Sequence, residues 1–181
     1  MSTPVHPVPF VWRPVTPADV FTLAAIYRDC ALRLGPLVYT PAQSRAWASF
    51  AEDEPGFRDY VLQADTWVAE RVGDTRALGF CGASRHGAGR DATRRDGASG
   101  DDAVREIHSL YVTPLLTRRG LGTALLRRTL QRAEHEGATR FAAWVTPFSK
   151  PVFLAAGFRL AQTVQAPFAG VMFERYRVER G

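Results

Sequence analysis

The sequence has few cysteines and no long apolar run. Its two cysteines, Cys30 and Cys81, stand in helix-like and strand-like patterns and lack the close spacing of metal ligands. We therefore interpret both as reduced core thiols, which favours a cytoplasmic protein, and we expect no bound metal. Prolines interrupt the first twelve residues, which have no basic start, so neither a signal peptide nor a membrane segment is expected. Residues 1–9 are predicted to be a mobile tail, and residues 10–181 a single domain.

Lysine is almost absent, because Lys150 is the only one among 23 lysines and arginines, which face 18 acidic residues. The net charge of +5 is therefore carried by arginine, whose planar guanidinium suits bidentate binding of phosphate or carboxylate. Such a charge fits either a nucleic acid or a polyanionic small molecule. The arginine-rich stretch at about 84–103 contains aspartates that offset its charge and no aromatic residue for base stacking. We interpret it as a flexible loop and expect neither nucleic acid nor a membrane as a partner.

Outside that loop, hydrophobic periodicity and turn signals predict an alternation of helices and strands. Two helices are expected from Thr16 to about Leu34 and from Thr40 to Phe50, each opened by a Thr-Pro capping sequence. A further, short helix is expected over Ser149–Ala156. Strands are expected over Phe10–Arg13, Trp67–Val72, Ala77–Ala83, Glu106–Val112, Thr139–Thr146, Arg159–Gln165 and Val171–Val178.

The stretch Val104–Ala138 combines a strand, a glycine-rich turn and a helix. The turn holds Gly120 and Gly122, and the leucines after it recur at helical spacing until Gly137 ends the pattern. Glycines let backbone N–H groups approach a ligand closely, and a helix N-terminus adds about half a positive charge. This arrangement is typical of phosphate binding.

Three motifs, EIHSLYVTP at 106–114, RRGLG at 118–122 and FLAAGF at 153–158, resemble the GCN5-related N-acetyltransferases (GNAT). The order of the elements resembles that family as well, and RPVTPAD and YTPAQSRAWA are similar to an uncharacterised bacterial subgroup of it. The resemblance implies an α/β (α+β) fold, with a mixed, mostly antiparallel sheet of about six to seven strands flanked by about four helices. The sheet would splay between strands 106–112 and 139–146. Dimers are common among such proteins, so a homodimer is also an expectation.

The resemblance implies acetyl-CoA as the cosubstrate and assigns residues to it. Backbone groups of Leu110, Tyr111 and Val112 would pair with the amides of the pantetheine arm, which would lie in the splay. The turn would bind the pyrophosphate through six consecutive residues. These are Arg118, Arg119, Gly120, Leu121, Gly122 and Thr123.

Two positions depart from the family pattern. Thr117 stands where Gln or Arg is usual, although the spacing from Pro114 to Gly120 is kept. Phe153 stands where many members have a tyrosine that protonates the leaving thiolate, and phenylalanine has no proton to give. Ser149, Tyr111 or water would then take that role. These departures also keep open an alternative reading, a catalytically degenerate domain that binds CoA or acyl-CoA as a sensor.

The predicted chemistry, acetylation of a primary amine by direct attack in a ternary complex, calls for a general base. An alkyl amine with a pKa near 10.4 is neutral in only about one molecule in 2,500 at pH 7, a penalty of roughly 4.6 kcal/mol. Glu106 matches the base of well-known family members. His108 is its rival, because an unperturbed imidazole titrates nearer to working pH than a carboxylate. Residues two apart in a strand share a face, so the two side chains are predicted to act at one site.

Tyr39, Trp47 and Phe50 are candidates for the walls of an acceptor pocket, which would take a small molecule or a peptide or protein amino group. The alternative for these aromatic residues is a place in the core. No cysteine lies in the catalytic stretch, so a covalent acetyl-enzyme is not expected.

Overall fold

The computed structural model describes residues 10–85 and 104–181 of the chain. The predicted tail over 1–9 lies outside the described residues. The predicted loop at 84–103 also lies outside them, except for its first two residues, which continue a strand. Among the helices in these two ranges, none is long and apolar enough to cross a membrane.

Seven strands form one sheet. They are β1 (Phe10–Pro14), β2 (Asp65–Arg71), β3 (Asp74–Arg85), β4 (Val104–Val112), β5 (Arg140–Val145), β6 (Arg159–Phe168) and β7 (Val171–Arg180). Their order in the sheet is β1-β2-β3-β4-β5-β7-β6. Neighbouring strands are antiparallel except for β4 and β5, which are parallel. The predicted mixed, mostly antiparallel sheet is confirmed.

Five α-helices accompany the sheet. They are α1 (Val20–Arg33), α2 (Pro41–Ala48), α3 (Glu54–Leu62), α4 (Leu121–His135) and α5 (Lys150–Ala155). The predicted capping box of α2 is present, since the hydroxyl of Thr40 accepts a hydrogen bond from the Gln43 amide at 3.2 Å. Sequence analysis predicted no element over residues 51–66, where α3 lies. Asp53 is the N-cap of this helix, and its carboxylate accepts a hydrogen bond from the amide of Gly56.

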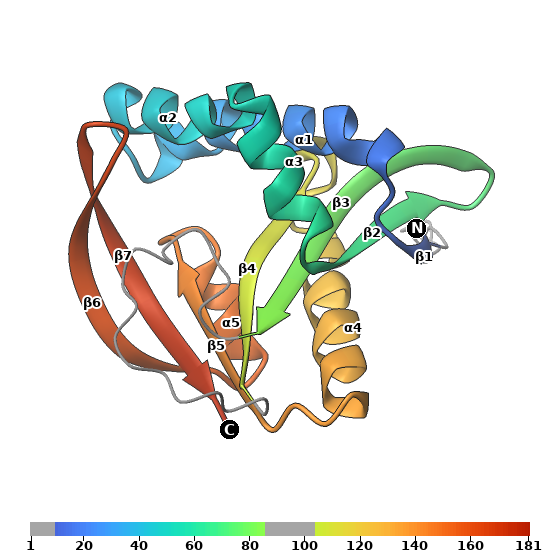
Figure 1. The fold of residues 1–181 in the computed structure, drawn as a ribbon. Helices are drawn as coiled ribbons and strands as arrows, with labels where there is room; N and C mark the ends of the chain where they lie inside the picture. Colours follow the sequence, from blue (N-terminus) through green and yellow to red (C-terminus); the bar gives the residue numbers. More distant parts are fainter. Residues whose placement is uncertain (1–9, 86–103) are drawn as a thin grey trace, which may run out of the picture.

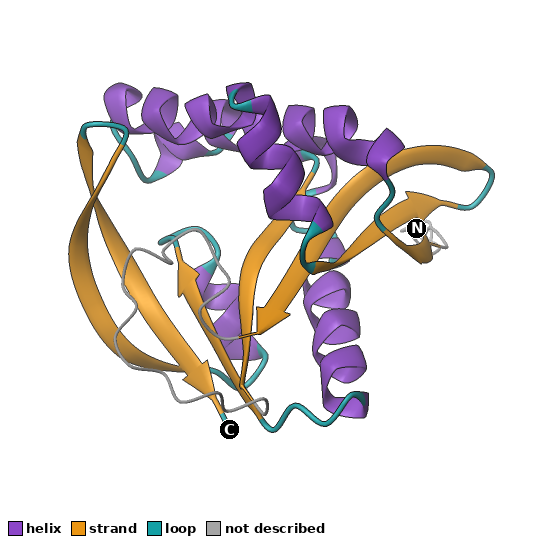
Figure 2. Cartoon of the chain, in the orientation of Figure 1, coloured by secondary structure: helices purple, strands orange, loops and turns teal. Residues whose placement is uncertain are grey.

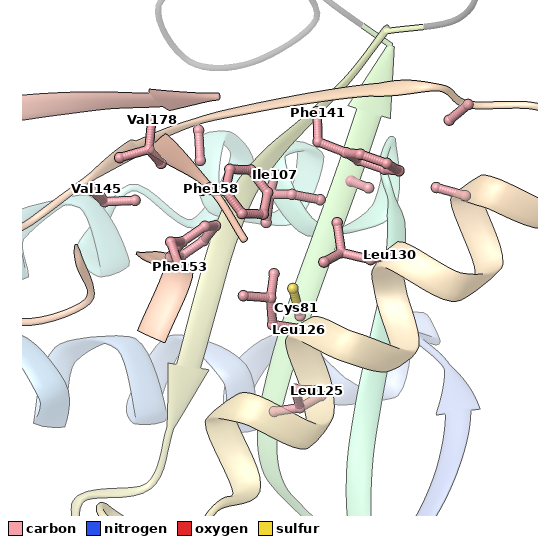
Figure 3. Close-up of a cluster of buried hydrophobic side chains, with 14 of the residues drawn as sticks. Cys81, Ile107, Leu125, Leu126, Leu130, Phe141, Val145, Phe153, Phe158 and Val178 are labelled. Carbon is pink, nitrogen blue, oxygen red and sulfur yellow. The ribbon is translucent and has the colours of Figure 1, made fainter. Parts of the chain in front are cut away.

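The helices cover the two faces of the sheet separately (Figures 1 and 2). Helices α1 and α3 pack on one face against Val68 and Phe80. Helices α4 and α5 pack on the other, where neighbouring residues of the same strands, Ala69 and Cys81, join the leucines of α4 (Figure 3). This alternation along β2 and β3 buries both faces of the sheet, as the period of two in a strand requires.

Strands β4 and β5 stay paired over only three residues each. Their register joins Val104, Arg105 and Glu106 to residues 140, 141 and 142. Beyond Glu106 the two strands diverge (Figure 1). The splay that the family resemblance implies is therefore present, between the two strands for which it was expected.

Candidate active site

Two cavities open along the splay. We call the larger one, of about 500 Å³, the loop cavity, because the turn before α4 forms one end of it. We call the smaller one, of about 290 Å³, the aromatic cavity, because tyrosine, tryptophan and phenylalanine make up most of its wall. Six residues line both cavities and therefore mark the place where they meet. They are Trp47, His108, Tyr111, Trp144, Val145 and Thr146.

The turn before α4 presents its backbone to the loop cavity. Gly120 is the residue before the helix and has a φ of 83°, a left-handed conformation that favours glycine. Its lack of a side chain leaves the first N–H groups of α4 without an N-cap side chain, so they remain available to an anion. Arg118, Gly120, Gly122 and Thr123 line the cavity. The side chain of Leu121 instead packs in the core, and Arg119 is exposed outside the lining.

The other predicted cofactor residues also line the loop cavity. Leu110, Tyr111 and Val112 contribute from β4, and Ser149 and Phe153 from the start of α5. The carbonyl of Val112 accepts a hydrogen bond from the thiol of Cys30 at 3.1 Å. Cys30 is a free, buried cysteine, and burial raises the pKa of its thiol to about 12, so the thiolate is scarce at neutral pH.

Phe153 is part of the core as well as of the cavity wall. Its ring is 3% exposed and lies 5.2 Å from the ring of Phe158 in an edge-to-face arrangement (Figure 3). The hydroxyl of Ser149 lies 3.1 Å from that of Thr146 and accepts from the Thr146 amide. Ser149 therefore has a hydroxyl proton to donate at this wall, whereas Phe153 has none.

His108 occupies an irregularity in β4 that sequence analysis did not predict. Ala83 of β3 pairs with Ile107, and the preceding residue of β3, Gly82, pairs with Ser109, so His108 is the extra residue of a β-bulge. The residue His108 has no paired residue in β3. Its carbonyl accepts a hydrogen bond from the hydroxyl of Tyr60. The imidazole packs against Gly82, where an added Cβ would lie 2.7 Å from the ring carbon Cε1. Gly82 therefore makes room for the ring.

Both ring nitrogens of His108 are buried, and the imidazole is neutral at pH 7. Within the described parts of the chain, neither of its ring nitrogens has a hydrogen-bond partner. Burial lowers the pKa of this imidazole from 6.5 to about 4. The sequence argument that His108 titrates nearer to working pH than a carboxylate is therefore wrong for the folded protein. What the structure provides instead is an unprotonated imidazole on the wall shared by the two cavities.

Glu106 lines the aromatic cavity together with His108. Its carboxylate accepts a hydrogen bond from Nη1 of Arg177 at 3.1 Å, and both side chains are about seven-eighths buried. Arg177 also lies 3.6 Å from the carboxylate of Glu179, and its guanidinium stands 5.5 Å from the centre of the Trp144 ring. An arginine from β7 thus holds the Glu106 carboxylate in the cavity wall.

The aromatic side chains predicted at the acceptor pocket separate into two groups. Tyr39 and Trp47 line the aromatic cavity, with their rings 5.9 Å apart and nearly perpendicular. Phe50 packs in the core against Tyr27 and Phe57, so the alternative reading holds for it. Sequence analysis missed the contributions of Trp144 and Arg175, which reach this cavity from β5 and β7. Among the described residues, no three histidine, cysteine or acidic side chains gather as a metal site would require.

The chain is similar to known proteins in both sequence and fold. The family model described as the acetyltransferase (GNAT) family matches residues 35–158. The chain is 25% identical over 160 residues to the uncharacterized N-acetyltransferase YafP of Escherichia coli (strain K12), with 88% of each chain covered. Its fold is similar to that of a GCN5-related N-acetyltransferase from Rhodopseudomonas palustris, with a TM-score of 0.77, 24% identity and 94% of both chains covered.

A second similar structure is the PaiA N-acetyltransferase of Thermoplasma acidophilum in complex with coenzyme A. It has a TM-score of 0.72 and 13% identity, with 95% of this chain and 98% of that chain covered. The family match defines the protein as an acyltransferase. The chain belongs to the acetyltransferase (GNAT) family, which confirms the resemblance seen in its motifs.

Proposed function

We propose that the protein acetylates a primary amine of a small molecule or of a peptide or protein by direct attack in a ternary complex, with acetyl-CoA in the loop cavity and the amine in the aromatic cavity. The observation that carries this proposal is the junction of the two cavities at His108, Trp144 and Thr146. Acetyl-CoA supplies an activated thioester when bound. The junction is where the two reacting groups would meet.

The residues of the loop cavity fit such a donor. The N-terminus of α4 faces one end of the cavity, and its positive potential favours a pyrophosphate there, supported by Arg118. Residues of the diverging strand β4, Leu110 to Val112, offer backbone groups to an extended arm. The coenzyme A in the similar structure from Thermoplasma acidophilum supports this assignment.

Glu106 and His108 are proposed to accept the proton of the amine. Both line the cavity that would hold the amine, and His108 is unprotonated at neutral pH. The wall beside α5 offers Ser149 to the leaving thiolate, because Phe153 cannot donate a proton there. Tyr111, which also lines the loop cavity, and water are the alternative donors.

Steady-state kinetics with acetyl-CoA and a panel of primary amines test this proposal. We expect amine-dependent release of CoA, with initial-rate lines that intersect when both substrates are varied, because both must be bound before the acetyl group moves. Parallel lines would indicate a covalent acetyl-enzyme and contradict direct attack. Binding of acetyl-CoA without CoA release for any amine would instead support the sensor alternative.

A further inference from the structure

The lining of the aromatic cavity is poor in aliphatic side chains. Within the part of the chain that the structure describes, Val145 is its only aliphatic member, whereas tyrosine, tryptophan and phenylalanine make up most of it. Aromatic rings attract one another in edge-to-face and offset arrangements, beyond the gain from removing their surfaces from water. A wall of this composition therefore favours a ligand with a flat, aromatic body.

A row of aromatic rings leads from the junction of the two cavities into the aromatic cavity. Trp47 lies at the junction, and its ring is 5.9 Å from that of Tyr39. The rings of Tyr39 and Phe173 are 5.2 Å apart, and those of Phe173 and Phe168 are 6.2 Å apart. The last three residues line the aromatic cavity but not the loop cavity. Since the reacting amine belongs at the junction, the body of the acceptor extends along this row.

The row ends where α2 meets the β6–β7 hairpin. The side-chain amide of Gln43 in α2 donates to the carbonyl of Met172 at 2.7 Å, and Figure 1 shows the tip of the hairpin beside this helix. Met172 is 51% exposed, whereas its neighbour Phe173 is 6% exposed, so the hydrogen bond lies outside and the ring lies inside. An acceptor that reaches Phe173 therefore meets a wall, which suits a free small molecule better than a side chain of a protein.

The cavity is small, and its row of rings is uncharged. Its volume of about 290 Å³ lies at the lower end of small-molecule sites, which run from roughly 300 to 1,000 Å³. Burial raises the pKa of Tyr39 to about 12, so its hydroxyl is neutral at pH 7. The charged groups of the lining have protein partners, because Glu106 pairs with Arg177 and the guanidinium of Arg175 lies 5.3 Å from the centre of the Trp144 ring. A neutral body fits this surface.

We propose that the acceptor is a small arylalkylamine, a neutral aromatic ring joined to a primary amine by a short alkyl chain, and that Tyr39, Trp47 and Phe173 bind its ring. The inference rests on the proposed acetyl transfer and narrows its acceptor. The amine nitrogen would form an amide bond with the acetyl carbon while the carbon–sulfur bond breaks. The nitrogen loses one proton, and the CoA thiolate gains one.

The test measures kcat/KM for four primary amines of similar basicity at saturating acetyl-CoA. They are 3-phenylpropylamine, 3-cyclohexylpropylamine, propylamine and Nα-acetyllysine methylamide, which places a lysine side chain on a peptide backbone. For the parent protein, we expect 3-phenylpropylamine to exceed propylamine about 10- to 100-fold, because its ring leaves water. It should exceed 3-cyclohexylpropylamine about 2- to 10-fold, because a saturated ring has no aromatic face. The lysine derivative should be a poorer acceptor than 3-phenylpropylamine.

Two variants show whether the row of rings causes this preference. Phe173→Leu and Tyr39→Leu keep apolar bulk and remove one ring each. Both should lower kcat/KM more for 3-phenylpropylamine than for propylamine, and should bring the phenyl and cyclohexyl amines closer together. Phe21→Leu is the matched control, because Phe21 is 87% exposed on α1 and lies outside the lining of both cavities. This control should keep the preference of the parent protein.

The inference is overturned if 3-phenylpropylamine and propylamine have equal kcat/KM in the parent protein, or if the lysine derivative is the best of the four acceptors. An equal loss for all four amines in both variants would assign Tyr39 and Phe173 a structural role and contradict their part in recognition. Each of these results leaves the proposed acetyl transfer standing, since an amine is still acetylated. No turnover of any of the four amines, in protein that binds acetyl-CoA, would overturn the inference and the transfer to such amines together.

Discussion

Replacing His108 with alanine and Glu106 with glutamine in one protein is expected to lower acceptor-dependent kcat/KM by about 10²- to 10⁴-fold, the usual contribution of general base catalysis. Both side chains line the cavity proposed for the amine. Glutamine keeps the shape of Glu106 and an oxygen for Arg177, so the change removes mainly the carboxylate charge. Initial rates with saturating acetyl-CoA measure the effect.

The two single variants show whether the residues act together. If they form one proton-accepting unit, each single change should cost nearly as much as the double change, because the effects of such residues do not add. The affinity for acetyl-CoA should hold in all three variants, and His135→Ala, on the exposed end of α4, should behave like the parent protein. Unchanged turnover in the double variant would remove both residues from the mechanism.

Acidification is expected to destabilise the fold through His108. The pKa of this imidazole is 6.5 in an unfolded chain and about 4 in the folded protein. Between these values the unfolded chain binds a proton that the folded protein does not, so the free energy of unfolding falls as the pH falls. This stabilising contribution is fully present above about pH 6.5 and is lost as the pH approaches 4, a loss of about 3 kcal/mol.

Denaturant unfolding of the parent and of His108→Gln at pH 7 and pH 4 measures this contribution. The difference in unfolding free energy between the two pH values should be about 3 kcal/mol smaller in the variant, since glutamine does not titrate. His135→Gln is the matched control, because it removes an exposed histidine and should leave the pH dependence unchanged. The same pH dependence in parent and His108→Gln would mean that the ring is not shielded from water.

The parts of the fold that the sequence predicts are those with strong local signals. The capping boxes, the leucine repeat of α4 and the alternation in β4 depend on neighbours in the chain, and these elements lie where they were expected. Helix α3 was missed because its first turn contains a glycine, Gly56, which is a turn signal in the sequence. The bulge at His108 was missed because it depends on the register of β4 against β3, which a single strand does not reveal.

The candidate site also has one part that the sequence predicts and one part that it does not. The turn from Arg118 to Thr123 could be predicted because all its groups are contiguous. The acceptor side is assembled from distant segments, so the sequence alone could not reveal that Arg175, Trp144 and Tyr60 line one cavity with Glu106 and His108. The environment also changed a chemical prediction, since burial at the bulge lowers the pKa of His108 to about 4.

The most direct test of the account is a thermal-unfolding titration of the protein with acetyl-CoA, with adenosine diphosphate as the control ligand. A ligand at 100 times its dissociation constant adds about 2.7 kcal/mol to stability, which corresponds to roughly 5–10 °C in Tm for a chain of this size. Gly122→Asp is the matched variant, because an added Cβ would meet only a side-chain carbon of Val112 at 3.8 Å while the carboxylate would face the loop cavity.

We predict a saturable rise in Tm with acetyl-CoA that exceeds the rise with adenosine diphosphate and is much smaller in Gly122→Asp. No rise at millimolar acetyl-CoA would contradict the assignment of the loop cavity and, with it, the proposed acetyl transfer.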